Sequence, residues 1–291
     1  ASGLTSVTIQ NTVASIGNNA FQNTSLSSIT IPKSVTSIGT DAFLDAALLQ
    51  TINVDGSNTN YLSDVNGVLF NSDYWLLIKY PEGKLDTSYN IPNSVTNIEV
   101  NSFINTYINK VFASPTLVSD NAYLNVGPEN TIGGKSGITV TEKAISITLS
   151  SKTIDENRES GFTIGSFTST LNSGETVTYT YELTDNTGEP NTVTISGDSL
   201  NTTSTIIDYE TDNSFTIIVK STYGDISSSQ TFIIDVANIN DAATDFTINT
   251  NTVSDNEEAG TTIGTFSVTD QDSTGVYTYT LLNHNDVFEI T

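Results

Sequence analysis

The sequence contains no cysteine, a single histidine and few basic residues, and each shortage excludes a class of chemistry. Without cysteine there are no disulfides, thiol nucleophiles or cysteine-based zinc and iron–sulfur sites. The single histidine, His284, lies in a turn-like stretch where we expect it to be exposed, so serine–histidine–aspartate catalysis has no second candidate. We predict that the protein is not an enzyme; a hydrolase with a carboxylate pair is the alternative that the acids leave open.

Positive charge is also scarce. Nine lysines and arginines stand against 33 acids, which gives a net charge of −24. Such a chain repels phosphate backbones and anionic surfaces, so we expect neither nucleic acid nor direct membrane insertion. No apolar run approaches the roughly 20 residues that cross a bilayer. The charge is −5 over residues 1–140 and −19 over the rest, which predicts two segments with different electrostatic roles.

What the chain does contain is repetition. At 291 residues and 36% apolar content, it exceeds one ordinary domain, and two or three modules are expected. Leu4–Ile9 and Leu26–Ile31 match at a shift of 22 residues, with later copies starting at Leu49 and Ile91. The same shift relates Val13 to Val35, Ile16 to Ile38, Ala20 to Ala42 and Phe21 to Phe43. Such a period predicts a solenoid of stacked repeats.

Alternation within each copy predicts short strands with one buried face. Ile29 and Ile31 share a face while Thr30 points the other way, and Gly17 and Gly39 are expected to permit the turn that follows. We expect the phenylalanine rings Phe21, Phe43 and Phe103 to fill the interior. The outward face predicted from this alternation is polar: Ser6, Thr8, Ser28, Thr30, Thr51 and Asn53. It could bind a glycan or a partner strand, but a solvated surface without a ligand is the simpler interpretation.

These repeats resemble the BspA-type leucine-rich repeats of bacterial and protist surface proteins, over roughly residues 4–125. An insert at 66–84 is similar to one found between such repeats, and we interpret its Trp75 as core packing rather than a sugar platform. From about Ile108 we expect an irregular end cap, and 133–137 is predicted to be a flexible linker. The resemblance implies a leucine-rich-repeat solenoid over residues 1–135 that serves adhesion or protein binding.

A different repeat follows, with a period of 99 residues. Asp155–Phe167 matches Ser254–Phe266, and both contain an acidic start followed by an alternating run. Further alternating runs, Phe215–Val219 and Thr231–Ile234, are separated by polar turns. This pattern predicts an all-β sandwich, so the whole fold is expected to be mostly β.

The 99-residue repeat resembles bacterial cadherin-type repeats in four stretches, 156–157, 208–211, 238–241 and 270–272. The resemblance implies a cadherin-like (Ig-like) β-sandwich over residues 144–241 and the N-terminal half of a second, truncated one over 242–291. It also implies Ca²⁺ between the two, held by Glu156, Asp208, Glu210, Asn238, Asn240 (through its main-chain carbonyl), Asp241, Asp270 and Asp272.

The residue types suit calcium independently, because this ion takes six to eight oxygen ligands. Asn238 stands where the family has aspartate and Ala243 where it has proline, so we expect weak sites, at roughly 10⁻⁴ to 10⁻³ M. The first repeat has Thr170–Ser173 where the second has Thr269–Asp272. We therefore predict one calcium joint, at residues 235–272, and none at the solenoid boundary.

The predicted function is that of a non-enzymatic, extracellular or cell-surface adhesion protein of bacterial type, with a solenoid head on a calcium-stiffened stalk. Its expected partner is a protein or glycan on another surface. The alternative is a self-assembling structural subunit of a surface layer or filament, which contacts copies of itself. Since Leu4 already belongs to a full repeat and the second sandwich is half-length, we expect a part of a longer protein.

Overall fold

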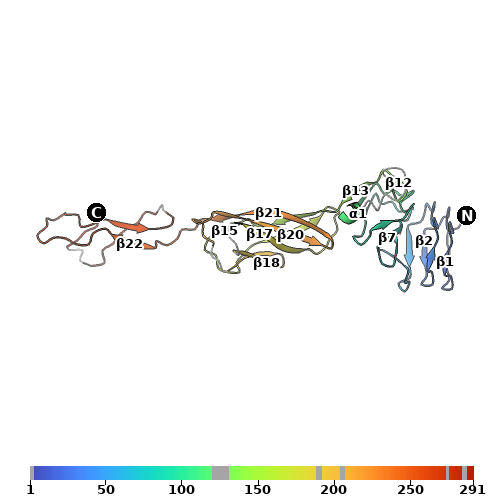
Figure 1. The fold of residues 1–291 in the computed structure, drawn as a ribbon, viewed down its shortest axis with the longest axis horizontal. Helices are drawn as coiled ribbons and strands as arrows, with labels where there is room; N and C mark the ends of the chain where they lie inside the picture. Colours follow the sequence, from blue (N-terminus) through green and yellow to red (C-terminus); the bar gives the residue numbers. More distant parts are fainter. Residues whose placement is uncertain (1–2, 120–130, 188–191, 204–206, 273–274, 284–286) are drawn as a thin grey trace. The chain divides into compact units, whose positions relative to one another are not determined.

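The computed structural model describes residues 3–119, 131–187, 192–203, 207–272, 275–283 and 287–291. The regular elements in these ranges are β-strands, apart from one short helix, α1 (Pro115–Ser119) (Figure 1). His284, expected to be exposed, lies outside them. Within them, no helix has the length and apolar character needed to cross a membrane. The chain divides into two compact units, the first made of residues 1–147, 169–180 and 221–229, and the second of 148–168, 181–220 and 230–291.

Parallel strands connect successive copies of the N-terminal repeat. They are β1 (Ser15–Ile16), β2 (Ser28–Ile31), β3 (Ser37–Ile38), β4 (Thr51–Val54), β8 (Ser88–Asn90), β10 (Lys110–Ala113) and β13 (Thr139–Glu142). β1 pairs with β3, β2 with β4, and β10 with both β8 and β13. Ser15 lies opposite Ser37, so the register of this pair reproduces the 22-residue period.

Burial follows the expected alternation along these strands. In β2 the isoleucines Ile29 and Ile31 are buried, whereas Ser28 and Thr30 are exposed. The rings of Phe43 and Phe103 are buried as expected, and Phe21 is half-buried and stacks on Phe43 with ring centroids 5.8 Å apart. Strand β2 therefore contributes one apolar face to the interior and leaves the other polar.

Asparagine and aspartate, not glycine, make the left-handed turns of the repeat. Positive φ angles recur at one repeat position in Asn19 and Asp41, with φ of 55° and 57°. A second position repeats the pattern in Asn23 and Asp45. Short polar side chains tolerate this conformation because they bond locally to the backbone. The predicted turns do start at Gly17 and Gly39, whose carbonyls accept the Ala20 and Ala42 N–H groups at 3.3 Å, although neither glycine has positive φ. A Cβ at Gly39 would lie 2.4 Å from the Asn18 nitrogen, so glycine is required there by close approach, whereas nothing crowds Gly17.

The insert forms a small sheet together with strands on either side of it. Strands β6 (Leu69–Asn71) and β7 (Leu76–Lys79) lie within the insert, β5 (Tyr61–Ser63) precedes it, and β9 (Asn97–Ile98) belongs to the copy that starts at Ile91, in the order β5-β6-β7-β9. Antiparallel pairing joins β5 to β6 and β6 to β7, and β9 then pairs with β7 in parallel. Trp75 is 41% exposed, so its predicted role in core packing is wrong.

The region after Ile108 is more regular than predicted. β10 extends the parallel pairing, and the expected linker is a hairpin of β11 (Thr131–Ile132) and β12 (Lys135–Ser136). Gly133 and Gly134 turn this hairpin with positive φ, and the Phe103 N–H donates to the Gly133 carbonyl at 3.0 Å. A Cβ at Gly133 would lie 2.1 Å from the Ser102 Oγ, so glycine is required by close approach as well as by φ.

Two four-stranded sheets follow. One has the order β14-β16-β19-β18, and the other β15-β21-β20-β17. Their bounds are β14 (Ile145–Leu149), β15 (Thr153–Asp155), β16 (Thr163–Leu171), β17 (Thr180–Thr187), β18 (Val193–Ser196), β19 (Ser199–Thr202), β20 (Ser214–Tyr223) and β21 (Ile226–Ala237). Alternate residues of the long strands are buried, such as Phe215, Ile217 and Val219 in β20. Strands β14, β16, β17, β20 and β21 have their two ends in different units.

The last part of the described chain contains β22 (Asp245–Ile248) and β23 (Phe266–Thr269), which pair antiparallel. The rings of Phe246 and Phe266 stack with centroids 5.1 Å apart, and Tyr279 contacts both. Phe246 remains 58% exposed. These strands therefore bury little apolar surface.

Candidate metal centre

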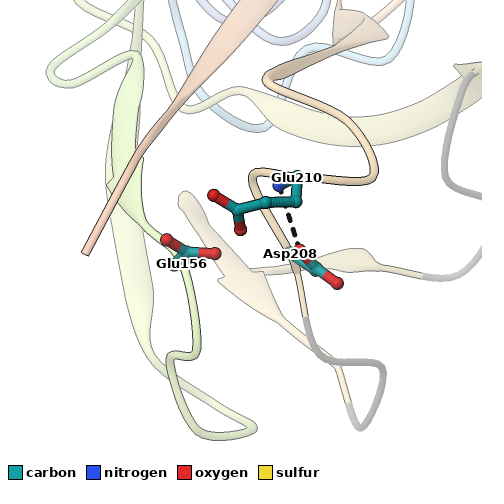
Figure 2. Close-up of side chains that lie close together, drawn as sticks. All are labelled: Glu156, Asp208 and Glu210. Carbon is teal, nitrogen blue, oxygen red and sulfur yellow. Dashed lines mark hydrogen bonds between the residues drawn. The ribbon is translucent and has the colours of Figure 1, made fainter. Parts of the chain in front are cut away.

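Three carboxylates converge beside the end of β15. Glu156 follows this strand directly, and Asp208 and Glu210 lie in the turn that precedes β20. One carboxylate oxygen of each lies within 4.8 Å of the other two. Figure 2 shows the Glu210 carboxylate pointing toward Glu156. Among the residues that the structure describes, this is the cluster of acidic side chains whose geometry suits a metal ion.

Glu156 is the buried member, with only 2% of its surface exposed. Its Oε2 accepts a hydrogen bond from the Tyr209 N–H at 2.8 Å, and its Oε1 accepts one from the Ile239 N–H at 2.7 Å. These two donors compensate for the loss of water around the charge. The carboxylate therefore ties three segments together: the end of β15, the turn before β20 and the chain after β21.

Asp208 organises its own turn. Its Oδ1 accepts the Glu210 N–H at 3.0 Å, the bond drawn in Figure 2, and its Oδ2 accepts the Thr211 hydroxyl at 3.1 Å. Desolvation raises the pKa of Asp208, but hydrogen bonds from Thr211, Glu210 and Gln271 outweigh it and hold that pKa below its ordinary value. The aspartate is therefore stabilised as an anion.

Glu210 has the opposite electrostatic behaviour. Desolvation, and after it repulsion from Glu156, Asp272 and Asp208, raises the pKa of Glu210 above its ordinary value. Its Oε1 accepts a hydrogen bond from the Asn238 side-chain amide at 2.8 Å. The negative charge of Glu210 is therefore costly here, and a nearby cation would relieve that cost.

Side-chain and main-chain amides connect the residues around the cluster. Asn157 donates from its side chain to Asp241 Oδ1 at 2.8 Å, from a backbone with φ of 58°. The Asn240 side chain donates to the main-chain carbonyl of Asp241 at 2.6 Å. The Asp241 N–H donates in turn to Asp272 Oδ2. Hydrogen bonds thus connect Asn157, which follows Glu156, through Asp241 to Asp272.

Asp270 and Asp272 lie at the far end of this chain. The Asp272 N–H donates to Asp270 Oδ1 at 3.0 Å, and Gln271 reaches back to Asp208 Oδ2 at 3.5 Å. Asp270 also accepts the Tyr277 hydroxyl at 2.6 Å, and this hydrogen bond, more than partial desolvation, raises the pKa of Tyr277 to about 12. Asp270 is therefore engaged mainly with its own repeat.

The structure thus brings together part of the predicted ligand set. Glu156, Asp208 and Glu210 form one group, with Asn238 bonded to Glu210. Asp241, Asp270 and Asp272 lie outside that group of three, although hydrogen bonds connect them to its surroundings. The full set of eight ligands stays a prediction.

Sequence reasoning missed several contributors, namely Asn157, Gln271, Tyr277 and the N–H groups of Tyr209 and Ile239. Asn157 and Gln271 had a usable signal, because each is adjacent in sequence to a predicted ligand. The main-chain donors had no such signal, since every residue except proline has a backbone N–H, and the sequence does not show which of these groups points at the site.

The donor set fits a hard cation. The three acidic side chains of the cluster each offer a carboxylate oxygen, and calcium binds such oxygens at roughly 2.3–2.6 Å. Two oxygens on opposite sides of one ion are then about 5 Å apart, which agrees with the 4.8 Å limit found here. Soft metals are a poorer match, because the sequence has no thiol to bind them.

The N-terminal part of the chain matches a known protein family. Residues 1–71 match the family described as "BspA type Leucine rich repeat region", in six copies. This part of the chain is therefore similar to BspA-type leucine-rich repeats. No curated protein matches the chain significantly.

Solved structures with partial similarity fall into two kinds. The pneumococcal vaccine antigen PcpA is 34% identical over 36% of this chain and 26% of its own, with a TM-score of 0.34. A leucine-rich cell surface protein of Faecalibacterium prausnitzii is 34% identical over 40% of this chain and 31% of its own, with a TM-score of 0.32. Cadherin domains 1–4 of protocadherin gamma B7 are 20% identical over 45% of this chain and 35% of their own, with a TM-score of 0.34. The chain thus spans about a third or less of these proteins' lengths.

Proposed function

We propose that this chain belongs to a non-enzymatic, secreted or cell-surface binding protein. In this proposal residues 1–135 form a leucine-rich-repeat solenoid that binds a partner. Residues 144–241 form a cadherin-like sandwich, and 242–291 begin a second one. Ca²⁺ held near residues 235–272 stiffens the joint between the two sandwich repeats.

The binding role rests on the repeats and on the polar face of their strands. The family match over residues 1–71 supports a repeat surface, and Ser28, Thr30 and Asn53 are exposed along paired strands. Small hydroxyl and amide groups at strand spacing suit hydrogen bonding to a protein strand or a glycan. A partner of either kind on another surface is therefore the proposed ligand.

The observation that carries the calcium proposal is the convergence of Glu156, Asp208 and Glu210. Three negative charges within 4.8 Å repel one another, and the raised pKa of Glu210 is one consequence. Calcium would supply the missing positive charge, with Glu156, Asp208 and Glu210 as ligands and Asn238 and Asp241 close by. Since these residues come from the strand end, the turn and the linker, a shared ion would reduce bending there.

The test is thermal unfolding of the whole chain in calcium and in EGTA, together with small-angle scattering. We expect calcium to raise the melting temperature and to narrow the distribution of interatomic distances within the chain. Asp208→Asn should remove most of this response. Glu182→Gln serves as the matched control, because Glu182 is an exposed acid on β17 outside the cluster.

If neither melting nor scattering responds to calcium, the joint proposal is wrong, although the binding role of the repeats would stand. Scattering at several protein concentrations also addresses the alternative of a self-assembling surface subunit. A mass that grows with concentration would favour that alternative, and a constant monomer mass would count against it.

A further inference from the structure

Lys143 is a buried lysine that contacts both a carboxylate and a side-chain carboxamide. Only 2% of its surface is exposed. Its Nζ lies 2.9 Å from Glu175 Oε2 and donates to Asn93 Oδ1 at 3.1 Å. The three residues are far apart in sequence, yet all belong to the first compact unit. An amine that contacts both a carboxamide and a carboxylate has the components of an amide exchange reaction.

We propose that Lys143 and Asn93 join through an intramolecular isopeptide bond, formed with the help of Glu175. The neutral Lys143 amine attacks Cγ of Asn93, a new C–N bond forms, and the Cγ–Nδ2 bond breaks. Lysine ammonium and asparagine amide become one secondary amide and one ammonium ion. No oxidant, reductant or cofactor is needed for this balance.

Glu175 has the position of a proton carrier. Its Oε2 faces the Lys143 ammonium, so it can take the proton that must leave before the amine becomes nucleophilic. The same oxygen accepts the Ser173 hydroxyl at 2.9 Å, which orients the carboxylate. The carboxylate then returns the proton to the departing Nδ2. The Glu175 side chain is 28% exposed, so the ammonia released has a route to water.

Local structure holds the two reacting groups in place. Lys143 directly follows β13, and its N–H donates to the Ala113 carbonyl at 2.8 Å. Asn93 lies in the turn of a repeat, where the copy that starts at Leu26 has Lys33. Lys33 is exposed, whereas Asn93 is half-buried and faces Lys143. Fixed neighbours of this kind raise the effective concentration of the amine at the amide.

The atom that must leave is bordered by a residue without a side chain. A Cβ built on Gly224 would lie 3.5 Å from Asn93 Nδ2, in ordinary van der Waals contact. Gly224 has φ of 59°, a conformation that other residues rarely adopt. The glycine therefore keeps space open beside the leaving nitrogen.

A second buried lysine shows what distinguishes this site from an ordinary ion pair. Lys79 is 6% exposed and contacts Glu82 Oε1 at 2.7 Å, much as Lys143 contacts Glu175. Its other acceptor, however, is the main-chain carbonyl of Asn101 at 3.1 Å. That carbonyl has no free amide nitrogen to release, because its nitrogen belongs to the chain. Lys79 thus has the pairing without the reactive partner.

The test is the intact mass of the purified full chain. We expect a mass below that of the sequence by one ammonia molecule. Proteolysis should then yield one branched peptide that contains residues 93 and 143. Peptide mapping also separates this outcome from ammonia loss by ring closure at Asn66-Gly67, which leaves no branched peptide.

Three variants sharpen the result. Lys143→Arg keeps the positive charge but cannot supply a neutral amine, so the ammonia loss should disappear. Glu175→Gln should slow bond formation, which a time course after refolding from denaturant would reveal. Asn90→Ala is the matched control, because Asn90 donates to the Ser173 carbonyl beside the site and contacts no lysine in the bonds described. It should leave the ammonia loss intact.

A native chain whose mass equals the sequence mass would overturn the proposal and leave Lys143 as part of an ion pair only. Ammonia loss that persists in Lys143→Arg would overturn it equally. Both outcomes are independent of the calcium proposal, because the mass is measured the same way in calcium and in EGTA.

Discussion

Two charged clusters of this molecule differ in how their charge is balanced. At Lys143 the ammonium lies against Glu175, so a positive and a negative group are both supplied by the chain. At Glu156, Asp208 and Glu210 the chain supplies three acids, and none of the salt bridges among the described residues includes them. Before the proposed bond to Asn93 forms, the first cluster is balanced by its own groups, whereas the second gains from an external cation.

The difference shows why similar burial has different consequences. Glu156 and Lys143 are each 2% exposed. Glu156 is compensated by two main-chain N–H groups, which are dipoles without net charge. A charge compensated only by dipoles still repels the acids beside it, and the raised pKa of Glu210 reflects that repulsion after desolvation. Ion dependence is therefore expected in one cluster and not in the other.

The largest predicted effect is from Glu156→Gln. The amide removes the charge and presents an N–H₂ group toward one of two buried N–H donors, which costs about 2–4 kcal/mol in free energy of unfolding. The calcium response should vanish as well. Chemical denaturation in calcium and in EGTA measures both effects.

Glu82→Gln is the control for that variant, because Glu82 is equally buried but pairs with Lys79. It should destabilise the protein while leaving the calcium response unchanged. Loss of the calcium response in both variants would show that general destabilisation, and not ligand loss, explains the result for Glu156.

The next effect in size is that of calcium on the unaltered chain. With an affinity near 10⁻³ M, a tenfold excess of the ion over its dissociation constant stabilises the folded state by about 1.4 kcal/mol. The melting temperature should rise with the logarithm of the calcium concentration above the dissociation constant. Calorimetry over a calcium series checks this dependence, and magnesium at equal concentration tests selectivity for the larger ion.

A smaller effect is expected at Asn157, which combines φ of 58° with the bond to Asp241. Asn157→Gly loses the bond but keeps the backbone conformation at little cost, whereas Asn157→Ala loses both. We expect alanine to be less stable than glycine by about 1 kcal/mol. Equal stabilities of the two variants in urea titrations would contradict a role for the left-handed conformation.

The smallest effect, and the one most sensitive to sign, concerns pH in EGTA. The pKa of Glu210 is raised, so the folded state holds this proton more readily and gains stability as pH falls through that pKa. The pKa of Asp208 is lowered, so its contribution is present above its unfolded pKa and is lost as pH falls through the folded one. Glu210→Gln should therefore raise the melting temperature at neutral pH in EGTA, while Asp208→Asn lowers it.

In calcium the same two variants should behave alike, because each removes a ligand oxygen's charge and reduces the calcium response. Melting curves across a pH series, with and without calcium, separate these expectations. Identical signs for Glu210→Gln and Asp208→Asn in EGTA would mean that the negative charge of Glu210 does not destabilise the folded state.

Periodicity carried much of the N-terminal prediction. The 22-residue shift appears in the register of Ser15 with Ser37, because residues that repeat in sequence take equivalent places in stacked copies. Burial of Ile29 and Ile31 followed from alternation. Trp75 was predicted wrongly, because its apolar neighbours indicate a strand without saying which side of it faces solvent.

Turn chemistry was the weaker part of the prediction. The sequence pointed to Gly17 and Gly39 for the turns, but the left-handed positions within those turns are taken by Asn19 and Asp41, since a side chain that bonds locally offsets the steric cost. The hairpin at 131–136 was taken for a linker, because its glycines suggest flexibility until Ser102 and Phe103 are seen to pack against Gly133.

The sequence by itself determined the repeat periods, the strand-rich character and the acidic residues from which a metal site could be built. Only the tertiary structure decided which acids meet: Glu156 with Asp208 and Glu210, while Asp270 engages Tyr277. It alone also placed Asn93 beside Lys143. The physical reason is that periodicity is a local property of the chain, whereas contact between distant side chains depends on how strands and turns are brought together.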